Sequence, residues 1–238
     1  MHNESSRSFL TIEACAFDID GTLYPEWKFY VLVFPFMLKN IALMNAFKQV
    51  RKDIRQYQKE HPKIILDFFD FQAEMLSKLL KKDKELIKEE VNKKIYTGWK
   101  PLFRKIRPYE NAKETIVALK SMGIRIGLLS DFLVEQKEDV WGILPHCDAS
   151  ISAESVGALK PSPHPFVALA KKLNVEPEKI LYVGNNIKYD VMGARSVGMK
   201  TALISSRFFK KKCKEVDIIF SDYRQLLEAL LWQFKVET

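Results

Sequence analysis

The sequence predicts an α/β fold, a Rossmann-like parallel sheet with helices on both faces, into which an all-helical segment is inserted. From Glu110 onward, short apolar runs alternate with stretches of helical periodicity, the pattern of a parallel sheet covered on both sides. Between Pro25 and Lys105 there is a single glycine, Gly98, and apolar residues recur at helical spacing. This second pattern is typical of helices packed as a bundle.

Six strands are expected in the sheet, each a short apolar run bounded by polar or turn-forming residues. These runs are Ile12–Phe17, Ile124–Leu129, Ala149–Ser152, Ile180–Val183, Thr201–Ile204 and Asp217–Phe220. Helices are expected between them at Asn111–Met122, Val134–Trp141, Pro165–Leu173, Lys188–Val197 and Tyr223–Phe234. We therefore expect a core made of residues 1–23 and 107–238 and a helical cap made of residues 24–106.

The positive charge of the chain is concentrated in the expected cap. The whole sequence has 38 Lys+Arg and 30 Asp+Glu. Residues 24–106 hold 18 and 10 of these, which leaves 20 of each elsewhere and a net charge of zero there. A basic segment could speed the encounter with an anionic substrate, although solvated helix faces explain it as well. Lys and Glu alternate without a recognisable binding motif, so no nucleic-acid partner is expected.

The longest apolar stretch also lies in the expected cap. Tyr30–Leu38 is wholly apolar, and Ile41–Phe47 is mostly so, but Pro35 and the Lys39-Asn40 pair interrupt the stretch. It falls short of the clean run of about 20 residues that crosses a bilayer. We expect a buried cap helix here and no membrane partner.

Cysteine and histidine usage indicates a reducing, cytoplasmic environment without a zinc site. Cys15, Cys147 and Cys213 are widely spaced and form no CxxC pattern, and the four histidines are scattered. The N-terminal residues MHNESSRS lack the apolar segment of a signal peptide.

Two carboxylates directly follow the first expected strand. The segment Phe17–Leu23 contains Asp18 and Asp20, then Gly21 and Thr22. In an extended chain residues i and i+2 point to the same side, so both acids can reach one pocket. Gly21 tolerates the positive φ that lets the chain turn away. The spacing pairs a candidate nucleophile with a candidate acid/base group.

Three later segments also place polar residues after strands or in turns. Ser130 and Asp131 end the second strand, and Lys160 lies in the proline-bounded turn 157–163. Asn185 follows the strand Ile180–Val183 and its glycine, and Asp190 lies five residues further on. In this order and spacing the four segments resemble the haloacid dehalogenase superfamily of aspartate-nucleophile phosphohydrolases, from about Ile12 to Ile204. The inserted helices resemble the cap of its helical-cap branch.

The resemblance implies a Mg²⁺-dependent phosphatase that acts on a small phosphorylated metabolite. Asp18 would be the nucleophile, and Asp20 would protonate the leaving alkoxide and then take a proton from water. The expected substrate-binding residues are Thr22, Ser130, Asp131 and Lys160. The expected Mg²⁺ ligands are Asp18, Asp20 through its backbone carbonyl, Asn185 and Asp190.

One position departs from the family pattern. Asn185 stands where the family usually has an acid directly after the glycine. An amide oxygen still ligates Mg²⁺, so we expect weaker metal binding with the same mechanism.

Several other functions use similar residues. A metal-independent 2-haloacid dehalogenase also uses an Asp nucleophile and often has Asn in the last motif, but a halide leaving group does not need Asp20. A phosphomutase would use the same residues, and a phosphonate hydrolase would need a cap lysine that the sequence does not single out. A catalytically weak phospho-ligand-binding protein is the alternative from another class. The substrate is not readable from the sequence, and a monomer or a homodimer is expected.

Overall fold

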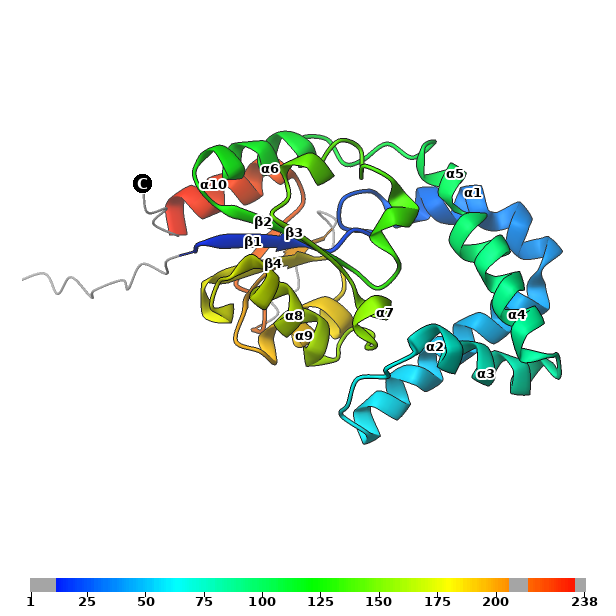
Figure 1. The fold of residues 1–238 in the computed structure, drawn as a ribbon. Helices are drawn as coiled ribbons and strands as arrows, with labels where there is room; N and C mark the ends of the chain where they lie inside the picture. Colours follow the sequence, from blue (N-terminus) through cyan, green and yellow to red (C-terminus); the bar gives the residue numbers. More distant parts are fainter. Residues whose placement is uncertain (1–11, 206–213, 234–238) are drawn as a thin grey trace, which may run out of the picture.

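A single six-stranded parallel sheet forms the centre of the computed structural model, which describes residues 12–205 and 214–233. The strand order is β3-β2-β1-β4-β5-β6 (Figure 1). The strands are β1 (Ala14–Phe17), β2 (Arg125–Ser130), β3 (Ala149–Ser152), β4 (Ile180–Gly184), β5 (Lys200–Ile204) and β6 (Ile218–Phe220). All five neighbouring pairs are parallel, which confirms the predicted sheet.

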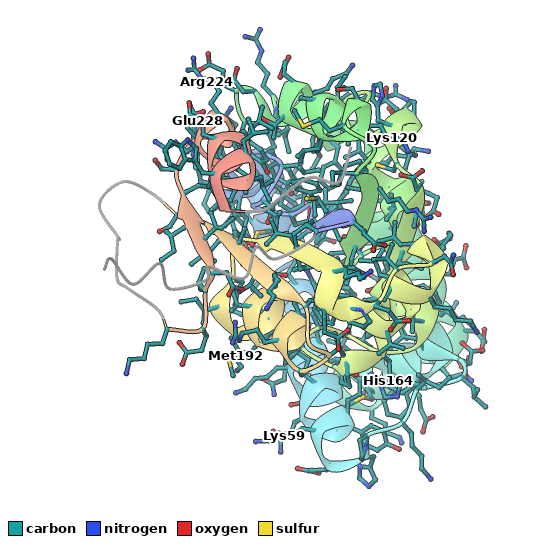
Figure 2. The ribbon with its side chains drawn as sticks, turned by 90° about the vertical axis from the view of Figure 1, so that its left-hand side faces the viewer. Lys59, Lys120, His164, Met192, Arg224 and Glu228 are labelled. Atoms are coloured by element: carbon teal, nitrogen blue, oxygen red, sulfur yellow. The ribbon has the colours of Figure 1, made fainter. Side chains whose placement is uncertain are left out.

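Helices cover both faces of the sheet, as predicted. They are α6 (Ala112–Ser121) and α10 (Tyr223–Gln233) on one face, and α8 (Pro163–Leu173) and α9 (Met192–Arg195) on the other. In Figure 2, Lys120, Arg224 and Glu228 mark the first face, and His164 and Met192 mark the second. Because both faces are covered, β1 and β4 are buried along their whole length. Their near-continuous apolar sequences follow from this burial.

The strand register brings the ends of three strands together. Phe17 of β1 lies beside Leu128 of β2 and Val183 of β4. The N–H of Asp18 still donates to the carbonyl of Val183 at 2.9 Å, so the first acid leaves the sheet at a fixed position. The polar residues that follow β1, β2 and β4 therefore meet at the carboxyl edge of the sheet, where α/β proteins bind ligands.

The segment between β1 and α6 is helical, lies at this edge and is the part of the chain predicted to be the cap. It consists of α1 (Glu26–Lys39), α2 (Ile41–Glu60), α3 (Phe68–Leu80), α4 (Lys84–Val91), the π-helical turn η1 (Asn92–Thr97) and α5 (Lys100–Phe103). Residues 61–67 separate α2 from α3, residues 81–83 separate α3 from α4, and residues 98–99 separate η1 from α5. The division into a 24–106 cap and a two-part core remains a prediction.

Two predicted helices differ from the structure. Residues 134–141 form only the 3₁₀ turn η2 (Val134–Lys137), followed by turns in which Glu138, Val140 and Trp141 have positive φ. The side chains of Val134, Gln136 and Lys137 are all buried, a spacing that does not fit one face of an α-helix. The helix predicted over 188–197 begins as the π-helical turn η5 (Ile187–Val191) and continues as α9.

Helix α1 is not the buried cap helix that was expected. Val33 is its only fully buried residue, and Trp27, Val31 and Phe34 are each more than half exposed. Within residues 12–205 and 214–233, no single helix is long and apolar enough to cross a membrane. Taken together, α1 and α2 have the length and apolar composition of a membrane span, but they are bent by 118° at their junction. Cys213 lies outside the described residues.

Candidate active site

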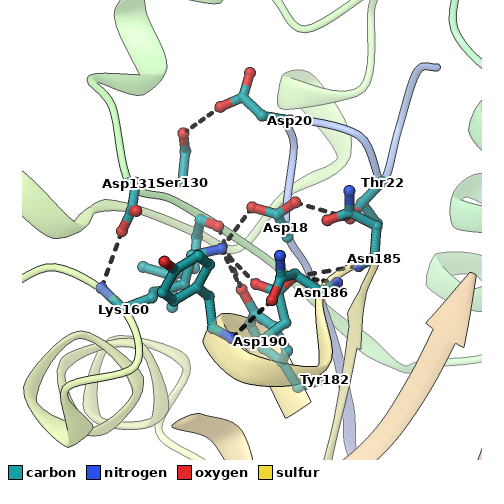
Figure 3. Close-up of polar contacts among 12 residues, drawn as sticks. Asp18, Asp20, Thr22, Ser130, Asp131, Lys160, Tyr182, Asn185, Asn186 and Asp190 are labelled. Carbon is teal, nitrogen blue, oxygen red and sulfur yellow. Dashed lines mark hydrogen bonds and ion pairs between the residues drawn. The ribbon is translucent and has the colours of Figure 1, made fainter. Parts of the chain in front are cut away.

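Lys160 is the centre of a buried ionic cluster at the carboxyl edge of the sheet. Its Nζ donates to Oδ1 of Asp18 and to Oδ1 of Asp190, each at 2.6 Å, and contacts the hydroxyl of Tyr182 at 3.3 Å. Figure 3 shows these three side chains converging on the ammonium group. The side chains of Lys160, Asp18 and Asp190 are at most 5% exposed. Sequence segments separated by more than 140 positions thus form one site.

Burial and neighbouring charges set the ionisation of this cluster. Burial raises the pKa of Asp18 to about 8, against the pull of Lys160 and with additions from Asp190 and Asp20. Burial alone would lower the pKa of Lys160, but Asp18 and Asp190 outweigh it and hold that pKa well above its usual value. The raised pKa favours the ammonium form of Lys160. Asp18 has fewer positive charges around it than its carboxylate form requires.

Asp190 organises the loop after β4. Its Oδ2 accepts the backbone N–H groups of Asn185 and Asn186 at 3.2 and 3.0 Å, while its Oδ1 is bound by Lys160. Gly184 is needed here, because a Cβ at that position would lie 2.4 Å from the Cβ of Asp190. With both oxygens engaged, Asp190 would reach a cation only through water. Its predicted role as a metal ligand stays a prediction.

Side-chain oxygens of Thr22 and Asn185 lie on the other side of Asp18. The hydroxyl of Thr22 donates to Oδ2 of Asp18 at 2.8 Å and lies 3.5 Å from Oδ1 of Asn185. A Cβ on Gly21, where φ is +83°, would meet the amide nitrogen of Asn185 at 2.1 Å. Glycine therefore allows both the turn and the close approach of the Asn185 side chain.

These donors fit a hard cation. No cluster of three or more His, Cys, Asp or Glu side chains suited to a metal occurs in the part of the chain that the structure describes. Mg²⁺ in proteins is held by one or two carboxylates with other oxygens and substrate phosphate. Asp18 and the amide oxygen of Asn185, which both lie within 3.5 Å of the Thr22 hydroxyl, would supply two such oxygens, and the backbone carbonyl of Asp20 stays the predicted third. A cation there would also provide the positive charge that Asp18 lacks.

Asp20 is held apart from Lys160 by three donors of its own. Its Oδ1 accepts the hydroxyl of Tyr24 at 2.7 Å, and its Oδ2 accepts the hydroxyl of Ser130 at 3.1 Å. The ammonium of Lys137 lies 3.1 Å from the same Oδ2 and 3.2 Å from the Ser130 hydroxyl. The two acids of the first motif therefore each have their own lysine.

Lys137 has no exposed surface. Besides Asp20 it contacts aromatic rings, with its Nζ 5.2 Å from the ring centre of Phe103 and 5.6 Å from that of Phe132. Cation–π attraction partly replaces the water that a buried ammonium loses.

Asp131 connects the core to the cap. Its Oδ2 forms an ion pair with Arg55 of α2, and its Oδ1 accepts the backbone N–H of Lys160 at 2.9 Å. The carboxylate is negatively charged, so it would repel the phosphate of a substrate. Its predicted contact with substrate stays a prediction, while its observed contacts fix the turn that carries Lys160.

Side chains on one face of α2 form hydrogen bonds with the same turn. Arg55 Nε donates to the carbonyl of Lys160 at 2.8 Å. The amide of Gln58 donates to the carbonyl of Gly157 at 3.0 Å and accepts the N–H of Leu159 at 3.1 Å. One turn earlier, Arg51 forms a buried ion pair with Glu154. Helix α2 thus holds the turn that carries Lys160 directly.

The structure brings together Asp18, Thr22, Lys160, Asn185 and Asp190 as the sequence predicts, with Asp20 and Ser130 beside them. Sequence reasoning missed Lys137 and Tyr182, and the α2 residues that hold the lysine turn by hydrogen bonds. The polar spacing of Arg51, Arg55 and Gln58 at i, i+4 and i+7 was a usable signal for the last group. Nothing in the sequence distinguished Lys137 from the many exposed lysines.

The sequence matches a known protein family. A model of the haloacid dehalogenase-like hydrolases matches residues 12–198, so the chain belongs to the haloacid dehalogenase-like hydrolase family. A glyceraldehyde 3-phosphate phosphatase of Methanopyrus kandleri is 26% identical over 205 residues, which cover 81% of this chain and 84% of the relative. A phosphoglycolate phosphatase of Aquifex aeolicus is 28% identical over 222 residues, which cover 90% and 94%.

Solved structures share the fold. A phosphatase of the same family from Thermococcus onnurineus superposes with a TM-score of 0.60 at 21% identity, covering 94% of this chain and all of that one. The L-2-haloacid dehalogenase of Xanthobacter autotrophicus gives a TM-score of 0.63 at 17% identity, covering 93% and 99%. Phosphatases and dehalogenases thus have the same architecture, and the side chains must distinguish them.

Proposed function

We propose that this protein is a phosphatase that hydrolyses a phosphomonoester of a small metabolite through a phosphoryl group carried on Asp18. The observation that carries the proposal is the pairing of two differently held acids. Asp18 is bound by Lys160 and Thr22, whereas Asp20 lies two residues on, beside Lys137 and Tyr24. A hydrolase that expels an alkoxide needs both a nucleophile and a separate proton donor.

Each residue has a definite part in the reaction. Asp18 attacks phosphorus, and the P–O bond to the leaving group breaks as Asp20, which must be protonated for this step, gives its proton to the departing oxygen. Asp20 then removes a proton from the water that attacks the aspartyl-phosphate, which releases phosphate and restores Asp18. Lys160 and the hydroxyls of Thr22 and Ser130 neutralise and orient the phosphoryl oxygens during both steps.

Mg²⁺ is the proposed cofactor. It would be held by Asp18, the backbone carbonyl of Asp20 and the amide oxygen of Asn185, with Asp190 reached through water. When bound, Mg²⁺ supplies positive charge against the phosphoryl oxygens and Asp18. Without it, the acids of the site outnumber Lys160 and Lys137 before a phosphate dianion has entered.

The two phosphatases that resemble this chain act, by their names, on a phosphorylated aldehyde and on a phosphorylated hydroxy acid. This supports a small phosphorylated substrate for the present protein. The substrate is best sought with a panel of phosphomonoesters and one 2-haloacid, assayed with and without Mg²⁺. Phosphate release from a phosphomonoester that requires Mg²⁺ supports the proposal. Halide release without phosphate release would instead assign the site to a dehalogenase.

A further inference from the structure

Helix α1 and the start of α2 expose a continuous apolar face. The face consists of Trp27, Tyr30, Val31, Phe34, Leu38 and Ile41, each between 52% and 63% exposed. The positions 27, 31, 34 and 38 recur at alternating steps of four and three, which places them on one side of α1. Figure 1 shows α1 beginning beside the carboxyl edge of the sheet and running outward next to α5.

The size of this face is at the upper end of what a monomeric protein exposes to water. At these exposures, and with about 150–250 Å² for a large side chain, the six residues present roughly 600 Å² of apolar surface. The largest apolar patch on a monomeric protein is typically about 300–600 Å², and patches of that size mark interaction sites.

The charge around this face is mostly positive, although Glu26 at the start of α1 accepts the hydroxyl of Tyr30 at 3.0 Å. Residues 27–52 contain the basic residues Lys28, Lys39, Lys48, Arg51 and Lys52 and no Asp or Glu. Arg51 is paired with Glu154 inside the protein, but Lys39, Lys48 and Lys52 are exposed. On α2, Lys48 and Lys52 stand seven and eleven residues after Ile41, so they continue the face that Ile41 begins.

We propose that this face docks the protein on an anionic lipid surface, in addition to the proposed phosphatase activity. Apolar side chains with Trp and Tyr among them, flanked by lysines, are what an interfacial helix presents to lipid headgroups and acyl chains. The excess of exposed lysines over Glu26 along α1 and α2 favours an anionic surface over a second copy of this chain, since two faces with a net positive charge would repel each other.

The helix lies on the surface and does not cross it. Helix α1 has 14 residues, about 21 Å of helix, whereas a bilayer core is about 30 Å thick. The bend of 118° between α1 and α2 also prevents the two helices from acting as one straight span. The expectation of no membrane partner assumed that this run was buried, and that assumption fails.

Cosedimentation of the full-length protein with vesicles tests the proposal. The protein should pellet with vesicles of phosphatidylcholine mixed with phosphatidylglycerol, remain in solution with phosphatidylcholine alone, and be released by added salt. Phe34→Asp should weaken vesicle binding by about tenfold or more, because it removes an inserted apolar group and adds a negative charge. Lys48→Ala and Lys52→Ala should each weaken it by about fivefold.

Trp232→Asp is the matched control, because Trp232 is 85% exposed on α10, far from this face in the sequence. It should bind vesicles like the wild type, and all variants should keep the wild-type circular dichroism spectrum. Equal pelleting of wild type and Phe34→Asp would overturn the proposal. So would a dimer in sedimentation equilibrium that Phe34→Asp dissociates, since the face would then belong to a second copy.

Discussion

The ammonium of Lys137 lies 3.1 Å from Oδ2 of Asp20, in a position with no access to solvent. Asp20 therefore has a charged partner that is separate from Lys160, the partner of Asp18. The carboxylate is held by Lys137 and Ser130 on one oxygen and by Tyr24 on the other. We interpret Lys137 as a positioning residue that fixes the proton donor of the proposed reaction.

Lys137→Met should lower kcat for an alkyl phosphate by about tenfold, a part of the about 10²–10⁴-fold that general acid catalysis provides. The loss should be smaller for p-nitrophenyl phosphate, whose leaving group departs with little help from an acid. Steady-state kinetics on the two esters measures the difference.

Lys100→Met, at an exposed cap lysine, is the control and should leave both rates unchanged. Equal losses on the alkyl and aryl esters in Lys137→Met would show that Lys137 supports the fold and does not position Asp20.

Asn185→Asp should tighten Mg²⁺, because it adds a full negative charge to the oxygen set beside Asp18. Coulomb attraction is large at contact, but desolvation cancels most of it. We expect the half-saturating Mg²⁺ concentration to fall by about tenfold, which is about 1.4 kcal/mol. Titration of activity against Mg²⁺ measures this, and an unchanged midpoint would remove Asn185 from the metal site.

Asp190→Asn should affect Lys160 more than the metal. The carboxylate oxygens bind Lys160 and the backbone of residues 185 and 186, so the variant loosens the phosphate-binding ammonium. KM for a phosphomonoester should rise by about tenfold, in proportion to the loss of about one charge-assisted contact, and the Mg²⁺ midpoint should move less. A large shift of the midpoint at constant KM would identify Asp190 as a direct ligand.

Asp131→Asn should destabilise the protein at neutral pH by about 2 kcal/mol, because Arg55 loses its charged partner. Burial alone would raise the pKa of Asp131, but Arg55, Arg51 and Lys160 outweigh it and lower that pKa below 3.8. An acid with a lowered pKa in the folded state stabilises the fold above its usual pKa and loses this effect as the pH falls.

The difference in unfolding free energy between wild type and Asp131→Asn should thus be constant from neutral pH down to about 5 and shrink below 3.8. Denaturant unfolding at a series of pH values measures it. A difference that grows on acidification would contradict the ion pair. Glu74→Gln, at an exposed ion pair on α3, provides the comparison and should show little effect at any pH.

The sheet and the centre of the site could be predicted because they depend on local patterns. Apolar runs such as Ile180–Val183 read as buried strands, and parallel strands bring their carboxyl ends to one edge. Asp18, Lys160 and Asp190 therefore meet even though they are far apart in sequence. The types of these three residues and their order along the chain are those of the haloacid dehalogenase-like hydrolases.

The residues that were missed depend on tertiary contacts. Lys137 is one lysine among many in the sequence, and only the fold turns it inward beside Asp20. Asp131 followed Ser130 at a strand end, which suggested substrate contact, but Arg55 from the cap takes its carboxylate. The apolar run around Phe34 predicted a buried helix, because apolar sequence alone does not reveal whether a neighbour covers it.

The central claim is that Asp18 carries the phosphoryl group during turnover. The most direct measurement is to quench the enzyme in acid while it hydrolyses a phosphomonoester with Mg²⁺ and to map its peptides by mass spectrometry. The peptide that contains Asp18 should gain the mass of one phosphoryl group in the wild type. Asp18→Asn should gain none and should release no phosphate. Undiminished phosphate release by Asp18→Asn, or a phosphoryl group on another residue in both proteins, would contradict the account.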